Sequence, residues 1–199
     1  MDARQIETLI EKKKQLRLKL AVRDFIHLHV IEWLPVMDHF KQKELPFLIN
    51  HLACINEYEL PYWKVELEKG KLASYKFDIA KLLISDEDPI HEKVLRNFPN
   101  TNPLRYVPDL PLKSSNSVNW KAELTLAADE LAIESAEVIF FYLRYSPVLT
   151  INMEALLSID EDPLGGMSED MVICTSDYSR MICRTLEDDW YWGSSDQYK

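Results

Sequence analysis

MVICTSDYSRMICRTLEDDWYWG, residues 171–193, is the stretch of sequence that decides the fold. Two short apolar runs, 171–175 and 180–185, flank the turn-forming residues 176–179 and predict a β-hairpin. If Thr175 lies opposite Arg180, the hairpin has one wholly apolar face, made of Val172, Cys174, Met181 and Cys183. A slip of one residue would mix the two faces, so this register is the self-consistent one.

The end of this stretch, EDDWYWG at residues 187–193, predicts a second turn and a third strand of a β-meander. Alternation along a strand places Trp190 and Trp192 on one face and Tyr191 on the other. Carboxylates beside large rigid rings suit an interface with a basic partner. The alternative interpretation is that both tryptophans close the edge of a core and that the acids cap it in water.

The totals indicate a globular chain of one domain, or of one domain with a small appendage. Of the 199 residues 47% are hydrophobic and only four are glycine, which excludes a disordered chain. The net charge of −10 is unevenly spread, because residues 1–23 carry +4 and residues 150–199 carry −8. An acidic C-terminal part would repel phosphates, so the sequence predicts no direct nucleic-acid binding and favours a basic protein partner.

The cysteines indicate a reducing compartment. There are three, an odd number, and they stand in apolar surroundings where a thiol acts as a small hydrophobic group. No apolar run approaches the length of a membrane span, and the N-terminus shows no cleavage site after an apolar region. We therefore expect a cytoplasmic protein that makes no membrane contact.

The N-terminal part, residues 1–98, is expected to combine helices with a β-hairpin. A helix is predicted over residues 3–20, with Ile6, Leu9, Ile10, Leu16 and Leu20 along one side. Residues 25–34 fit a helix or a strand and are expected to end at Pro35, and Pro46 is expected to begin a helix that runs to residue 55. Strands are predicted at 62–68 and 71–77 around Lys69-Gly70, and a helix from 88 to 98.

The remaining chain is expected to hold a loop, a long helix and the meander. Residues 99–119 contain four prolines and several serines and predict a loop. A helix over 120–145, capped by Asn119 or Ser117, and a strand over 148–152 follow. The chain is thus predicted to be α+β, with helices packed on small antiparallel sheets and a C-terminal β-meander. Its parts, 1–98, 99–119 and 120–199, are expected to form one compact domain.

Candidate chemistry is sparse in this sequence. The histidines at 27, 29, 39 and 51 are the only set that resembles metal ligands, but no HExxH or paired-cysteine motif accompanies them. We interpret them as structural and predict no metal and no cofactor. An alternative remains open, in which a hydrolase or transferase assembles its site from His27, His29, Glu32 and Cys54.

A small acidic chain that lacks catalytic motifs and ends in EDDWYWG resembles bacterial immunity proteins, which neutralise toxins that include basic nucleases. The resemblance implies a non-enzymatic protein-binding module that occludes a basic cleft. Carboxylates of this chain would pair with Lys and Arg residues of the toxin's cleft. Tyr191 or Trp192, beside Trp190, would fill a pocket in that cleft. The carboxylates are Asp160, Glu161, Asp162, Asp177, Glu187, Asp188 and Asp189. A third possibility is a scaffold subunit whose basic N-terminal helix is the docking element.

Overall fold

An antiparallel sheet organises the protein in a computed structural model that describes residues 3–51, 58–77, 90–102, 107–142, 147–162 and 170–198. Its seven described strands follow the order β1-β4-β3-β5-β6-β7-β2. They are β1 (Phe47–His51), β2 (Lys113–Asn116), β3 (Glu137–Tyr142), β4 (Val148–Asn152), β5 (Met171–Thr175), β6 (Arg180–Arg184) and β7 (Asp189–Ser194). The predicted α+β class and the C-terminal meander β5–β7 are confirmed.

The β5–β6 hairpin adopts the predicted register. Val172 pairs with Cys183, and Cys174 pairs with Met181. The turn between the strands is held by Asp177, whose carboxylate accepts hydrogen bonds from the Ser179 backbone N–H at 3.0 Å and from a threonine hydroxyl at 2.6 Å. Both faces of the hairpin are buried, since each belongs to a different hydrophobic cluster. The hairpin is therefore the middle of a covered sheet, which explains its nearly continuous apolar sequence.

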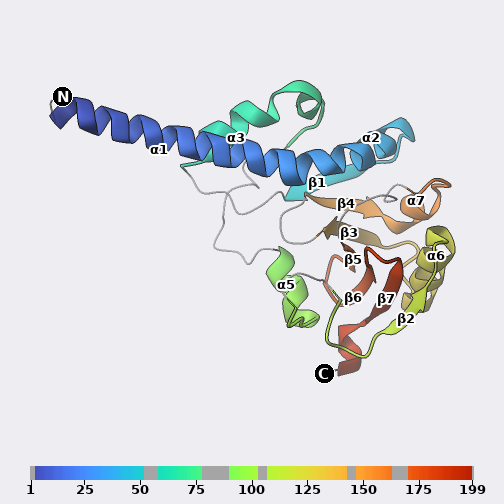
Figure 1. The fold of residues 1–199 in the computed structure, drawn as a ribbon. Coiled ribbons are helices and arrows are strands. Elements are labelled where there is room, and N and C mark those ends of the chain that lie inside the picture. Colours follow the sequence, from blue (N-terminus) through green and yellow to red (C-terminus); the bar gives the residue numbers. More distant parts are fainter. Residues whose placement is uncertain are drawn as a thin grey trace.

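Helices cover the two faces of the sheet (Figure 1). The described helices and helical turns are α1 (Ala3–Phe25), the π-helical turn η1 (Ile26–Val30), the 3₁₀ turn η2 (Ile31–Trp33), α2 (Leu34–Gln42), α3 (Leu60–Leu67), the 3₁₀ turn η3 (Gly70–Ser74), α5 (Ile90–Asn97), α6 (Trp120–Leu131), α7 (Met153–Leu157) and the 3₁₀ turn η4 (Ser195–Tyr198). Helices α2, α6 and α7 pack on one face in the largest cluster, which also holds Trp190 and Trp192. Helix α5 packs on the other face through Val94 and Phe98.

The first helix extends well beyond the sheet (Figure 1). It continues through η1 and η2 into α2, so the predicted helix over 3–20 is confirmed and is longer than expected. Its C-terminal half packs against α3 in a third cluster that includes Val22, Ile26, Trp63 and Leu67. Pro35 does not end the segment, because it stands in the first turn of α2, where a missing N–H breaks no helical hydrogen bond.

Two predictions for the N-terminal part are wrong. The expected hairpin at 62–77 is the helix α3 followed by η3: Trp63 and Leu67, one helical turn apart, are buried while Val65 between them is exposed. In the helix, Trp63 and Leu67 point to the same side and pack against α1. This packing prevails over the alternation of apolar and charged residues that suggested a strand. The helix expected from Pro46 is instead β1, an edge strand that pairs with β4.

Two further predictions fail around the central loop. The helix expected over 120–145 begins as predicted, with the Asn119 side chain accepting from the Ala122 N–H, but it ends at Leu131. Ala132 then adopts a left-handed conformation with φ 51°, and the strongly β-forming run after it becomes β3. The loop predicted at 99–119 contains the edge strand β2, which pairs with β7.

Candidate functional site

The tryptophans of the predicted interface lie in the core. Trp190 and Trp192 are 1% and 4% exposed, and each indole N–H is satisfied internally. Trp190 donates to the Ser117 carbonyl at 3.2 Å, and Trp192 donates to the Glu130 carboxylate at 2.5 Å. The expectation that Trp192 fills a pocket on a partner is therefore wrong. Tyr191 lies on the opposite face, half-buried against the cluster that α5 covers.

The structure brings two of the predicted acidic runs together at one end of the sheet. The Arg184 guanidinium donates to Asp162 at 2.8 Å and to Asp188 at 2.9 and 2.7 Å. It also stacks over the Trp190 ring, with 5.3 Å between the guanidinium carbon and the ring centroid. Segments 160–162 and 187–189 thus share one surface, which we call the acidic end.

The other predicted acids divide between this surface and a distant one. Asp160 pairs with Lys121 at 2.7 Å, and that hydrogen bond lowers the pKa of its carboxyl. Glu161 lies 3.8 Å from the His39 imidazole, and Asp189 accepts from the side chain of Asn116. Asp177 lies at the opposite end of the hairpin and caps its turn. The predicted single patch therefore excludes Asp177.

Nothing in the described residues supports the enzymatic alternative. No group of three His, Cys, Asp or Glu side chains in them has a metal-binding arrangement. His27 lies on the π-helical turn, whereas Cys54 and the side chains of His29 and Glu32 lie outside what the structure describes. Cys174 is fully buried, and burial raises the pKa of its thiol, which disfavours the reactive thiolate.

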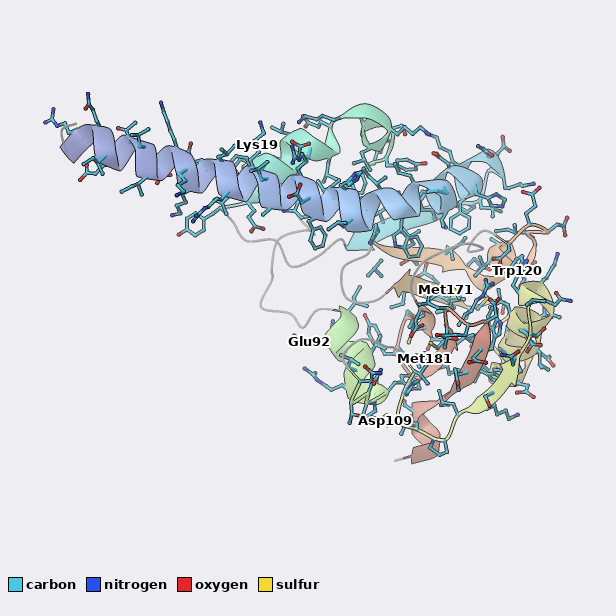
Figure 2. All side chains as sticks on the ribbon, in the orientation of Figure 1. Lys19, Glu92, Asp109, Trp120, Met171 and Met181 are labelled. Carbon is cyan, nitrogen blue, oxygen red and sulfur yellow. The ribbon has the colours of Figure 1, made fainter. Side chains whose placement is uncertain are left out.

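Figure 2 shows side chains standing free of the sheet along the projecting part of α1, where Lys19 is labelled. Large apolar side chains of this helix are exposed. Four of these apolar side chains and one lysine follow one another at steps of three, four, three and four residues and so lie in a row along the helix. We call this row the α1 ridge: Ile6, Leu9, Lys13, Leu16 and Leu20. The four apolar members are between 37 and 55% exposed. Helical geometry places the ridge on the side opposite the α3-facing residues Leu18, Val22 and Phe25. α3 therefore leaves the ridge open.

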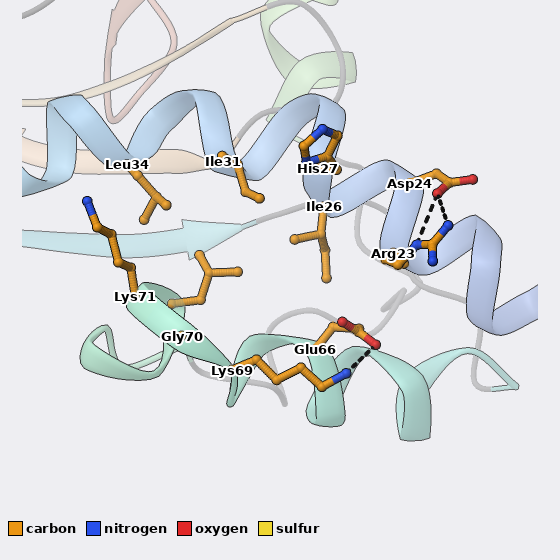
Figure 3. A pocket seen from close by; sticks show the side chains of 11 residues that line it. Arg23, Asp24, Ile26, His27, Ile31, Leu34, Glu66, Lys69, Gly70 and Lys71 are labelled. Atoms are coloured by element: carbon orange, nitrogen blue, oxygen red, sulfur yellow. Dashed lines mark hydrogen bonds and ion pairs between the residues drawn. The ribbon is translucent and has the colours of Figure 1, made fainter.

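A cavity lies between α1–α2 and α3–η3, on the α3 side of the helix and beyond the C-terminal end of the ridge (Figure 3). The cavity measures about 590 Å³, and its floor is apolar, formed by Ile26, Ile31, Leu34 and Leu72. Further helical steps from Leu20 reach Arg23 and His27, which both line it. The π-helical turn η1 makes part of this wall, and such turns are frequent at functional sites.

Charged side chains surround both the cavity and the ridge. Arg23 bonds Asp24 at 3.1 Å and Lys69 bonds Glu66 at 2.7 Å on the cavity rim, where Lys71, which lies 4.0 Å from the Asp38 carboxylate, is a further cation. Beside the ridge stand the cations Lys12, Arg17 and Lys19, and α1 as a whole carries seven Lys or Arg against three acids. The α1 surface is thus basic on a chain whose net charge is −10.

The sequence pattern places the four apolar ridge residues, together with Ile10, along one side of a helix but does not show that they are exposed. The periodicity that places them on one side of a helix is the same for a stripe that packs inside the protein. The cavity joins residues 23–34 to residues 66–72, and no local pattern signals that contact.

No described helix has the length and apolar character needed to cross a lipid bilayer. Comparisons with protein families, with curated proteins and with solved structures find no match to this chain.

Proposed function

We propose that this protein is a non-enzymatic protein-binding module that docks its partner along the α1 ridge and the adjoining cavity. The observation that carries the proposal is the exposure of Ile6, Leu9, Leu16 and Leu20 on a helix that projects from the sheet. Contiguous apolar surface rimmed by polar residues is typical of interaction sites. Among the possibilities that the sequence leaves open, this proposal corresponds to docking through the basic N-terminal helix.

The energetics require the ridge and the cavity to act together. Covering a half-exposed Leu or Ile contributes about 1 kcal/mol, so the four apolar ridge residues contribute about 4 kcal/mol. The loss of translational and rotational freedom on association opposes binding by at least about 4 kcal/mol. A large apolar side chain of the partner in the cavity supplies the remaining free energy, in the way that a few buried anchors dominate other interfaces.

Co-purification with matched variants tests this proposal. Leu9→Glu with Leu16→Glu places two charges on the ridge, and Thr8→Glu with Gln15→Glu places two charges at exposed positions about 100° around the helix from these leucines. Both pairs preserve helix-forming residues, so both variants should fold. A protein retained by the wild type and by the control pair, but lost from the ridge pair, supports the proposal. Retention by all three contradicts it.

A second candidate interface is the acidic end, favoured because Arg184 holds two acidic runs side by side. We propose that it serves an immunity-type interaction with a basic protein in a bacterial cytoplasm, a reducing compartment that suits the buried thiols of Cys174 and Cys183. Glu161→Lys with Glu187→Lys tests it, since both side chains are exposed and neither bonds to Arg184. An association rate with a basic partner that is unchanged by this reversal contradicts this second candidate.

A further inference from the structure

We propose that the occupant of the α1 ridge is an acidic amphipathic α-helix of another protein. This inference rests on the proposed function and names the partner's chemistry. It follows from three properties of α1: the heptad spacing of the apolar ridge, the lysine within it and the cations on both of its sides.

The spacing of the ridge matches a helical partner. Steps of three and four residues from Ile6 to Leu20 are the a and d positions of a heptad pattern. The 14 residues between these ends span about 21 Å at 1.5 Å per residue, which is roughly two heptads of contact. A second helix laid along this seam can insert its own apolar side chains between those of the ridge.

Charge excludes a second copy of this chain as the favoured partner. In a parallel pair, Lys13 of one copy would lie beside Lys13 of the other, and Lys12 would face Arg17. In an antiparallel pair, flanking positions of the same kind meet, so Lys12 would lie near Lys19. Either arrangement sets like charges against each other, which is a recognised means of rejecting a wrong partner.

The same cations favour an acidic helix. A partner with Glu or Asp at its flanking positions places carboxylates opposite Lys12, Arg17 and Lys19, and an acid at one seam position can pair with Lys13. Such a partner would also be repelled by the acidic end of the molecule and attracted by α1. Its approach would therefore be directed to the N-terminal helix.

A lipid surface fits these observations less well. Helices that lie in a membrane interface present a wide apolar face that includes aromatic residues. Residues 3–20 contain no Phe, Trp or Tyr, and Lys13 interrupts the apolar row at its centre. An apolar row that has no aromatic residue and is interrupted by Lys13 therefore suits a helix better than a bilayer.

The test uses the full chain and two synthetic helical peptides of about three heptads with the same Leu seam. One peptide carries Glu at the flanking positions and opposite Lys13, and the other carries Lys at those positions. Affinities are measured by titration calorimetry for the wild type, for the Leu9→Glu, Leu16→Glu variant and for a charge-reversed variant, Lys12→Glu with Arg17→Glu. We expect the wild type to bind the acidic peptide at least about tenfold more tightly, and the charge-reversed variant to lose or invert that preference.

Each remaining outcome overturns a defined part of the inference. Equal affinity for both peptides, or failure of both to bind, refutes the acidic helix as partner. Sedimentation that shows dimers of the chain lost in the ridge variant refutes the heterotypic partner. Tighter association with phosphatidylcholine–phosphatidylserine vesicles than with the acidic peptide assigns the ridge to lipid. The proposed function fails separately, when the ridge variant retains the proteins that co-purify with the wild type.

Discussion

Replacing Arg184 by Met removes the cation that joins the two segments of the acidic end. In the folded chain its guanidinium bonds Asp162 on one side and Asp188 on the other, and it lies over the Trp190 ring. Met preserves most of the apolar stem that packs there, so the change isolates the loss of charge and hydrogen bonds. We expect the fold to survive with reduced stability.

The size of the effect follows from how far the three groups are buried. The Arg184 side chain is only 12% exposed, and those of Asp162 and Asp188 are 22% and 34% exposed. Breaking a fully buried ion pair costs about 3–5 kcal/mol, and a fully exposed pair is worth at most about 1 kcal/mol. This site lies between these limits, so we expect a loss of about 2–3 kcal/mol. At about 2–4 °C per kcal/mol for a chain of this size, the Tm should fall by about 4–12 °C.

Urea denaturation of the wild type, Arg184→Met and a matched control measures this loss. The control is Lys121→Met, because Lys121 pairs with Asp160, whose side chain is 91% exposed. Its change in the free energy of unfolding should stay within about 0.5 kcal/mol. Adding Asp162→Asn and Asp188→Asn to Arg184→Met should recover part of the loss, since the two negative charges that faced the guanidinium are then removed as well. A cost for Arg184→Met as small as that of the control refutes the reasoning.

Two further expectations concern the meander. Hydrogen bonds from Thr175 and Ser179 lower the pKa of Asp177, so its ionised form stabilises the fold above the unfolded pKa, and this stability is lost as the pH falls through the folded value. Asp177→Asn should therefore lower the Tm at pH 7, and the difference from the wild type should shrink below about pH 4; a constant difference contradicts this. At Gly193 an added Cβ would stand 2.6 Å from the Leu112 Cδ2. Gly193→Ala should cost about 1–2 kcal/mol, and a double-mutant cycle with Leu112→Ala should show coupling above about 0.5 kcal/mol, whereas additive effects count against the contact.

The sequence predicts the meander best, because local rules act together there. In residues 171–184, turn chemistry at Asp177 and the separation of apolar from charged faces agree on one register, and the structure adopts it. The same reasoning fails at 62–68. There both a period of two and a period of four fit Trp63 and Leu67, and only their packing on α1 selects the helix.

The sequence does not show which residues of the candidate sites pair with each other, because these pairs are far apart along the chain. Asp162 and Arg184 are 22 residues apart, and Trp192 reaches Glu130 across 62 residues, so neither pairing has a local pattern. Whether a stripe such as Leu9 and Leu16 is covered depends on where other elements lie. The acidic residues lie close together in the sequence, but the β5–β6 hairpin separates Asp177, in its turn, from the acidic end, which lies at Arg184.

A photo-crosslinking amino acid placed on α1 in living cells tests the central claim most directly. Positions 16 and 15 form a matched pair, because both are exposed and consecutive, and helical geometry turns them about 100° apart. If the ridge docks a partner, the probe at Leu16 yields a defined crosslinked protein and the probe at Gln15 yields much less. Further probes at positions 161 and 187 report on the acidic end. Equal crosslinking at positions 15 and 16, or crosslinking only from positions 161 and 187, would contradict the assignment of the interface to α1.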